Sequence, residues 1–257
     1  MRTNFVKKKL LNGEPTLGCF MGMESATVAE LLVHAGYDWI VVETEHNGVD
    51  SADVKQILMA MSSGDSIPVI RVPSSEPIHI QRALDLGGMG VLVPMTRTAE
   101  EVEKIVRATR YPPQGTRSWG GLRPTKYTIE SKDYMSNAND NMLVCLIVET
   151  KEAIDNLEEI AAVPGLDVLF MGMWDLCLSH GLNPIDMPFP ETDAIVERVR
   201  RVGRENGVAV GTGFYDQENL RKCISEGYTW IASAPDYSML VRAAQDNVAA
   251  FREETNG

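Results

Sequence analysis

Short apolar runs alternate with amphipathic segments along the whole chain. Between the apolar runs, segments such as SATVAELLVHAG, EPIHIQRALDLGG, TAEEVEKIVRATR and DQENLRKCISEG place apolar residues at helical spacing. The eight apolar runs have the length of buried strands and cover residues 17–21, 39–42, 68–72, 90–94, 143–148, 166–171, 208–211 and 229–233. Strands that alternate with helices predict parallel βαβ units, and eight such units predict a (β/α)8 TIM barrel.

An open doubly wound sheet is the alternative to a barrel. The turn after the first apolar run, GCFMGMES, lacks the GxGxxG pattern of a dinucleotide site in such a sheet. This disfavours the open sheet. We therefore expect one TIM-barrel domain over residues 1–257.

One connection is much longer than the others. Residues 111–141 link the fourth predicted helix to the fifth predicted strand and are rich in Pro, Gly and Ser. Ordinary connections between a helix and the next strand have only a few residues. We interpret this segment as an excursion or lid on the domain, with a predicted helix over residues 127–135.

Composition narrows the possible partners and compartment. A net charge of -12 disfavours nucleic acid and anionic membranes as partners. No run reaches transmembrane length, and the basic start of the chain lacks the apolar core of a signal peptide. The four cysteines show no CxxC spacing, which is typical of buried thiols in a reduced, cytoplasmic protein: Cys19, Cys145, Cys177 and Cys223.

Charged residues follow several of the predicted strands at their carboxyl ends. Active sites of TIM barrels lie at this end. The residues are Glu43, Glu45 and His46 after the second strand, Arg71 in the third, Glu149 after the fifth and Asp175 after the sixth. We therefore expect these side chains to meet at one rim of the barrel.

Glu149 and Asp175 are candidates for a metal site. They follow neighbouring strands, and two carboxylates with further positions open to water and substrate suit Mg²⁺ or Mn²⁺. Alternatively, each carboxylate only stabilises the start of the helix that follows it. The pairing on adjacent strands favours the metal site.

Arg71 and His46 each have a functional and a structural interpretation. Arg71 follows three apolar residues, so its charge requires a partner, either a substrate oxygen or a salt bridge to Glu43 or Glu149. His46 has Glu43 or Glu45 as a carboxylate partner and is a candidate general base, although a solvated histidine fits the same pattern. No predicted strand contains a lysine, which disfavours Schiff-base chemistry.

The stretches GYDWIVVETEHNGVD, VIRVP, RYPPQGTR, LIVETKEAIDNL and GLDVLFMGMWDLCLSHG together resemble the HpcH/HpaI aldolase family over nearly the whole chain. The resemblance implies a TIM barrel with a swapped C-terminal helix, assembled as a homo-oligomer, usually a hexamer built from dimers. It implies an aldolase that cleaves or forms a 4-hydroxy-2-oxo acid through a metal-stabilised pyruvate enolate, with an aldehyde as the other product.

The same resemblance assigns roles to individual residues. It implies that Glu149 and Asp175 bind Mg²⁺ or Mn²⁺, with Co²⁺ as a further candidate, and that Gly172, Met173, Trp174 and Asp175 surround the pyruvate carboxylate. Arg71 would contact the keto oxygen of pyruvate, and His46 would act as the base in a dyad with Glu43. Asp85 would be an acid contributed across a subunit interface.

This sequence departs from the usual family pattern near these positions. Glu43 stands where Asp is usual, Ile147 where Gln is frequent, Trp174 where a small residue is usual, and Cys177 where Ser is usual. Trp119 and Trp174 are expected to reshape the acceptor side. Two alternatives therefore stay open: related enolate chemistry such as oxaloacetate decarboxylation or macrophomate-synthase-like bond formation, and a non-catalytic barrel that binds small acids.

Overall fold

The computed structural model describes residues 1–214 and 216–256, and Tyr215 and Gly257 of the predicted domain lie outside them. Eight parallel strands pair in chain order and close into a barrel, which confirms the predicted fold. The strands are β1 (Thr16–Met21), β2 (Trp39–Glu43), β3 (Ile67–Arg71), β4 (Gly90–Val93), β5 (Leu143–Val148), β6 (Val168–Met171), β7 (Ala209–Gly213) and β8 (Trp230–Ala232).

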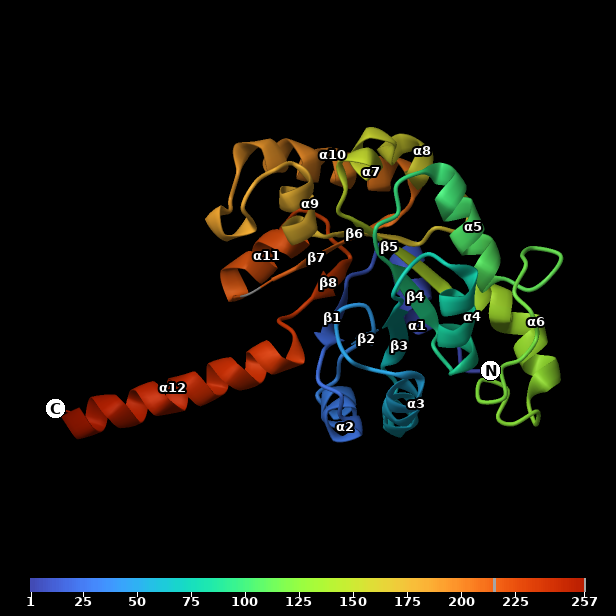
Figure 1. The fold of residues 1–257 in the computed structure, drawn as a ribbon, viewed down its shortest axis with the longest axis horizontal. Coiled ribbons are helices and arrows are strands. Elements are labelled where there is room, and N and C mark those ends of the chain that lie inside the picture. The colour runs from blue at the N-terminus through green and yellow to red at the C-terminus, as the bar shows by residue number, and fades with distance from the viewer. Residues whose placement is uncertain (215, 257) are drawn as a thin grey trace.

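Most of the helices surround the barrel on its outer side (Figure 1). The helices of the described residues are α1 (Phe5–Leu11), α2 (Ala26–His34), α3 (Ser51–Ala60), α4 (Pro77–Asp85), α5 (Ala99–Thr109), α6 (Ser131–Asn141), α7 (Lys151–Asp155), α8 (Leu157–Ala161), α9 (Met173–Ser179), α10 (Pro190–Asn206), α11 (Gln217–Ser225) and α12 (Asp236–Asn256), with 3-10 turns η1 (Met61–Ser63) and η2 (Pro184–Asp186). Local signals set several starts: the Ser25 side chain caps α2, and Thr98 with Glu101 forms a capping box on α5.

The barrel interior is apolar and closed at its amino-terminal end. Val6 and Leu10 of α1 pack into the same cluster as Trp39 and Trp230, whose rings stack with centroids 3.8 Å apart. Gly18 makes room for this stack, because a Cβ there would lie 2.0 Å from the Trp39 ring. The open end, which we call the mouth, is therefore at the carboxyl ends of the strands.

The excursion of residues 111–141 packs against the end opposite the mouth. Its helix is α6, which begins at Ser131, so the helix predicted for residues 127–135 was placed too early. Arg117 pairs with Asp85 at the end of α4, and Arg123 donates to the carbonyl oxygens of Leu58 and Leu86. In this chain the excursion does not cover the mouth. Trp119, whose ring lies 5.9 Å from that of Tyr111 in the same segment, does not line it either.

Helix α12 leaves the barrel and extends away from it (Figure 1). Its start is anchored, since the Asp236 carboxylate accepts hydrogen bonds from the main-chain N–H groups of Gly22 and Met23. No helix in the described part of the chain has both the length and the apolar character needed to cross a membrane. All four cysteines are buried free thiols, as predicted.

Candidate active site

Strand geometry brings three of the predicted charged residues into the mouth. Glu43 and Arg71 are directly paired in the register of β2 and β3, so their side chains share one side of the sheet. Val41 and Val69, two residues earlier on each strand, belong to the interior cluster. By the same alternation, Glu149 projects inward two residues after the interior Ile147.

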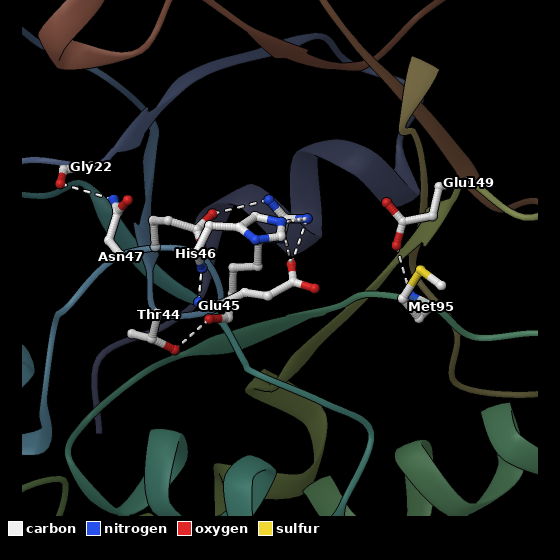
Figure 2. Close-up of polar contacts among 9 residues, drawn as sticks. Gly22, Thr44, Glu45, His46, Asn47, Met95 and Glu149 are labelled. Carbon is white, nitrogen blue, oxygen red and sulfur yellow. Dashed lines mark hydrogen bonds and ion pairs between the residues drawn. The ribbon is translucent and has the colours of Figure 1, made fainter. Parts of the chain in front are cut away.

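Arg71 lies at the centre of an ion-pair cluster. Its guanidinium contacts Glu43 Oε2 at 3.0 Å, Glu45 Oε2 at 2.5 Å and His46 Nε2 at 3.4 Å (Figure 2). Thr44 contributes its hydroxyl, which donates to the carbonyl oxygen of Arg71 at 2.6 Å and ties the loop to β3. The salt bridge expected between Arg71 and Glu43 is present. The one considered between Arg71 and Glu149 does not occur.

The carboxylate beside the His46 ring belongs to Glu45. Glu45 Oε2 lies 3.4 Å from His46 Nε2. Glu43 Oε1 instead accepts hydrogen bonds from the main-chain N–H groups of Glu45 at 2.6 Å and His46 at 3.1 Å. The expected side-chain dyad of His46 with Glu43 is therefore not formed. The residue that follows a strand turns with the loop, so strand alternation could not predict which glutamate would reach the ring.

Burial raises the pKa of the Glu45 carboxyl, with Arg71 and His46 acting against that shift and the carboxylates of Glu43 and Asp175 adding to it. Two carboxyl groups, those of Glu43 and Glu45, thus share the single guanidinium of Arg71 within a partly buried space. Such a space favours the arrival of another cation.

Glu149 lies across the mouth and points toward the side that carries Glu45 and His46 (Figure 2). Only 2% of the residue is exposed, and Oε1 accepts a hydrogen bond from the Met95 N–H at 2.6 Å. Burial, helped by the charges of Asp175 and Glu45, raises its pKa to about 7 in spite of that bond and of Arg71. Met95 holds a left-handed backbone, with φ at 55°, and the sequence carried no signal for this donor.

Gly172 brings α9 close to Glu149. Gly172 N–H donates to the Val148 carbonyl, and a Cβ on Gly172 would lie 2.8 Å from Glu149 Cβ and 2.9 Å from its Oε2. Asp175 follows in the first turn of α9. A side chain at position 172 would therefore crowd the Glu149 carboxylate, and glycine permits the close approach of α9, which carries Asp175.

The donor set fits a divalent cation with an open coordination sphere. Glu149 is a buried carboxylate whose Oε1 accepts the Met95 N–H and whose Oε2 has no hydrogen-bond donor among the described residues, and Asp175 is close enough to raise its pKa. Among residues 1–214 and 216–256, no three Asp, Glu, His or Cys side chains converge as a complete metal cage. A cation held here would take its other ligands from water and substrate, which is usual for Mg²⁺ and Mn²⁺.

Residues 16–243 match the HpcH/HpaI aldolase/citrate lyase family. The chain belongs to this family. Aldolases and citrate lyases both break carbon–carbon bonds, so the chain is a carbon–carbon lyase, as predicted.

Relatives within the HpcH/HpaI family cover nearly the whole chain. A 2-dehydro-3,6-dideoxy-6-sulfogluconate aldolase of Pseudomonas putida is 37% identical over 92% of both chains. A 4-hydroxy-2-oxo-heptane-1,7-dioate aldolase of Escherichia coli is 36% identical over 96% of this chain and 95% of its own. The crystal structure of a family member from Burkholderia cenocepacia superposes with a TM-score of 0.92 at 36% identity, covering 97% of this chain and all of that one.

Asp85 does not reach the mouth of its own barrel. It ends α4 at the opposite end, where Arg117 holds its Oδ1 at 2.8 Å. Any catalytic role for Asp85 therefore requires the mouth of another copy, as the family resemblance implied. By contrast, Trp174 and Met173 do lie at the mouth, in the first turn of α9, and 55% of Trp174 is exposed.

Proposed function

We propose that the chain cleaves a 4-hydroxy-2-oxo acid into pyruvate and an aldehyde, and catalyses the reverse condensation, with Mg²⁺ or Mn²⁺ bound by Glu149 and Asp175. The observation that carries this proposal is the buried Glu149 carboxyl, which faces the Arg71 cluster with a pKa of about 7. A carboxylate buried without a salt bridge is costly unless a cation joins it. When bound, the cation would supply positive charge for the oxygens of the 2-oxo acid.

Arg71 supplies a second positive charge and a directed donor. Its terminal nitrogens are engaged by Glu43 and Glu45, but the buried Nε has no hydrogen-bond partner among the described residues. A buried N–H without a partner is uncommon and favours a ligand oxygen. We assign this group to the keto oxygen, where negative charge develops as the enolate forms.

His46 is the group that moves the proton. In cleavage the imidazole takes the proton of the 4-hydroxyl, the bond between C3 and C4 breaks, and its electron pair stays on the pyruvate fragment as the enolate. Condensation returns the proton to the new hydroxyl. Glu45 lies beside the ring and stabilises the positive charge that the imidazole gains. Since 63% of the His46 side chain is exposed, it reaches outward from the buried charges toward an aldehyde.

Cleavage of 4-hydroxy-2-oxopentanoate, followed by coupled detection of pyruvate, tests the proposal. We expect activity with Mg²⁺ or Mn²⁺, none in EDTA, and recovery on adding the metal back. His46→Asn should lower kcat/KM by roughly 10²- to 10⁴-fold, the usual effect of losing a positioned general base.

The same variant separates cleavage from decarboxylation. Oxaloacetate yields the enolate by losing CO₂, so its turnover requires no base and should persist in His46→Asn. Equal losses in both reactions would contradict the role of His46, and turnover of oxaloacetate alone by the unmodified chain would favour the decarboxylase alternative.

A further inference from the structure

The mouth is divided into a charged half and an apolar half. The charged half lies at the ends of β2, β3 and β5. Glu43 and Arg71 are the last residues of β2 and β3, and Glu149 directly follows β5. The other half is formed by β1, β6, β7 and β8, which lie side by side because β8 pairs with β1. If the pyruvate fragment occupies the charged half, the remainder of the substrate meets the other one.

Two phenylalanines form the floor of the apolar half. Phe20 of β1 and Phe170 of β6 pack against the interior cluster, and their ring centroids lie 5.4 Å apart. Both are partly exposed, whereas Val168 and Trp230 in the same cluster are fully buried. Because α1 closes the opposite end of the barrel, the exposed surface of these rings faces the mouth.

Small residues leave space above this floor. A Cβ on Gly213 of β7 would meet nothing nearer than the Ala232 carbonyl oxygen, at 3.8 Å. Gly213 and Ala232 are register partners at the ends of β7 and β8. No bulky side chain from either of these two positions fills the space beside Phe170.

No basic residue follows the strands of this half. The segments 22–25, 172–175, 214–216 and 233–235 contain no Lys or Arg in the sequence. Apart from Asp175, which is assigned to the metal, their acidic residues are Glu24 and Asp216. Arg97 and Lys151, the other basic residues next to the mouth, follow β4 and β5 on the charged side. An anionic substituent on the apolar half would therefore lose hydration against phenylalanine rings and meet like charge.

We propose that the aldehyde used by this chain is uncharged and has an apolar substituent, which packs on Phe20 and Phe170. This inference rests on the proposed function and specifies its acceptor. On this inference the acceptor of this chain differs from those of the two relatives described above, because the substrates in their names carry a sulfo group or a second carboxylate.

The test compares condensation of pyruvate with butanal and with 4-oxobutanoate, which have the same number of carbons and differ in the terminal carboxylate. We expect kcat/KM to be higher for butanal by about tenfold or more, within the range by which a binding site discriminates one substituent. Equal values, or a preference for 4-oxobutanoate, would overturn the inference.

Phe170→Ala provides a second readout. It should lower kcat/KM for butanal by about fivefold or more relative to acetaldehyde, whose single methyl group is too short to use the ring. An unchanged ratio would contradict packing on Phe170. Because this variant removes core contacts, thermal unfolding establishes that it is folded, and the comparison of aldehydes in the unmodified chain does not depend on it.

Arg97→Gln is the matched control. If the charged half bound an anionic tail through Arg97, this variant would lose activity on 4-oxobutanoate selectively, and that result would overturn the inference. We expect the ratio of kcat/KM for the two aldehydes to stay unchanged.

Exchange of the pyruvate methyl protons with solvent tests the proposed function separately, because it involves no aldehyde. Absence of exchange would reject the proposed function itself. Exchange together with a preference for 4-oxobutanoate over butanal would reject only this inference.

Discussion

At the scale of single residues, the site depends on which carboxylates share the charge of Arg71. Glu43 and Glu45 both form ion pairs with the guanidinium, and Glu149 does not. Glu43 also accepts two main-chain N–H groups, so it holds the loop that carries His46. Glu149 is left as a buried acid with one donor, which makes it the residue whose ionisation a metal would change most.

The pH dependence of stability follows from Glu149. Its pKa is about 7 in the folded chain, raised by burial from an ordinary value near 4.5. Folding therefore favours its protonated form, and this contribution to stability is present at low pH and is lost as the pH rises through about 7. The full effect of such a shift is roughly 3 kcal/mol. We expect metal-free Glu149→Gln to melt roughly 5 °C above the unmodified chain at pH 8, and close to it at pH 5.

Thermal unfolding in EDTA at the two pH values measures this difference. Glu103→Gln on the exposed side of α5 is the control and should change the melting temperature little at either pH. Adding Mg²⁺ at pH 8 should raise the melting temperature of the unmodified chain and not that of Glu149→Gln. A difference between Glu149→Gln and the unmodified chain that does not vary with pH would contradict the assignment.

At the scale of elements, α12 is exceptional because it leaves the barrel with an apolar face uncovered. Its large apolar residues are between 48% and 69% exposed and fall on one side of the helix: Tyr237, Leu240, Val241, Val248 and Phe251. An isolated helix of this length is only marginally stable in water. We propose that a second copy of the chain covers this face, as the predicted helix swap implies.

The oligomeric state tests the role of α12. Leu240→Glu together with Val248→Glu should lower the molar mass measured by light scattering, because two charges would be buried in the contact. Ala250→Glu, on the opposite side of the helix, should leave the mass unchanged. If the unmodified chain is an oligomer and the Leu240→Glu/Val248→Glu variant keeps its molar mass, or if the unmodified chain is a monomer, the proposal is wrong.

At the scale of the whole molecule, the barrel fold and the residues that line its mouth could be predicted, because buried parallel strands leave a clear pattern in the sequence. Buried strands are continuous apolar runs, and charged residues just after them can only lie at the mouth. The partner of His46, the Met95 donor and the position of residues 111–141 could not be predicted in this way. They depend on loop conformations, such as the left-handed backbone of Met95, for which the sequence carries no periodic pattern.

The arrangement of Arg71, its two carboxyl partners and the buried Glu149 at the mouth supports one central proposal, namely that the mouth binds a metal and forms the enolate of pyruvate. Exchange of the pyruvate methyl protons in D₂O, followed by NMR, measures that step without any choice of aldehyde. We predict exchange with Mg²⁺ or Mn²⁺ that disappears in EDTA and in Glu149→Gln. Absence of exchange with every divalent metal, in a chain that is folded, would contradict the account.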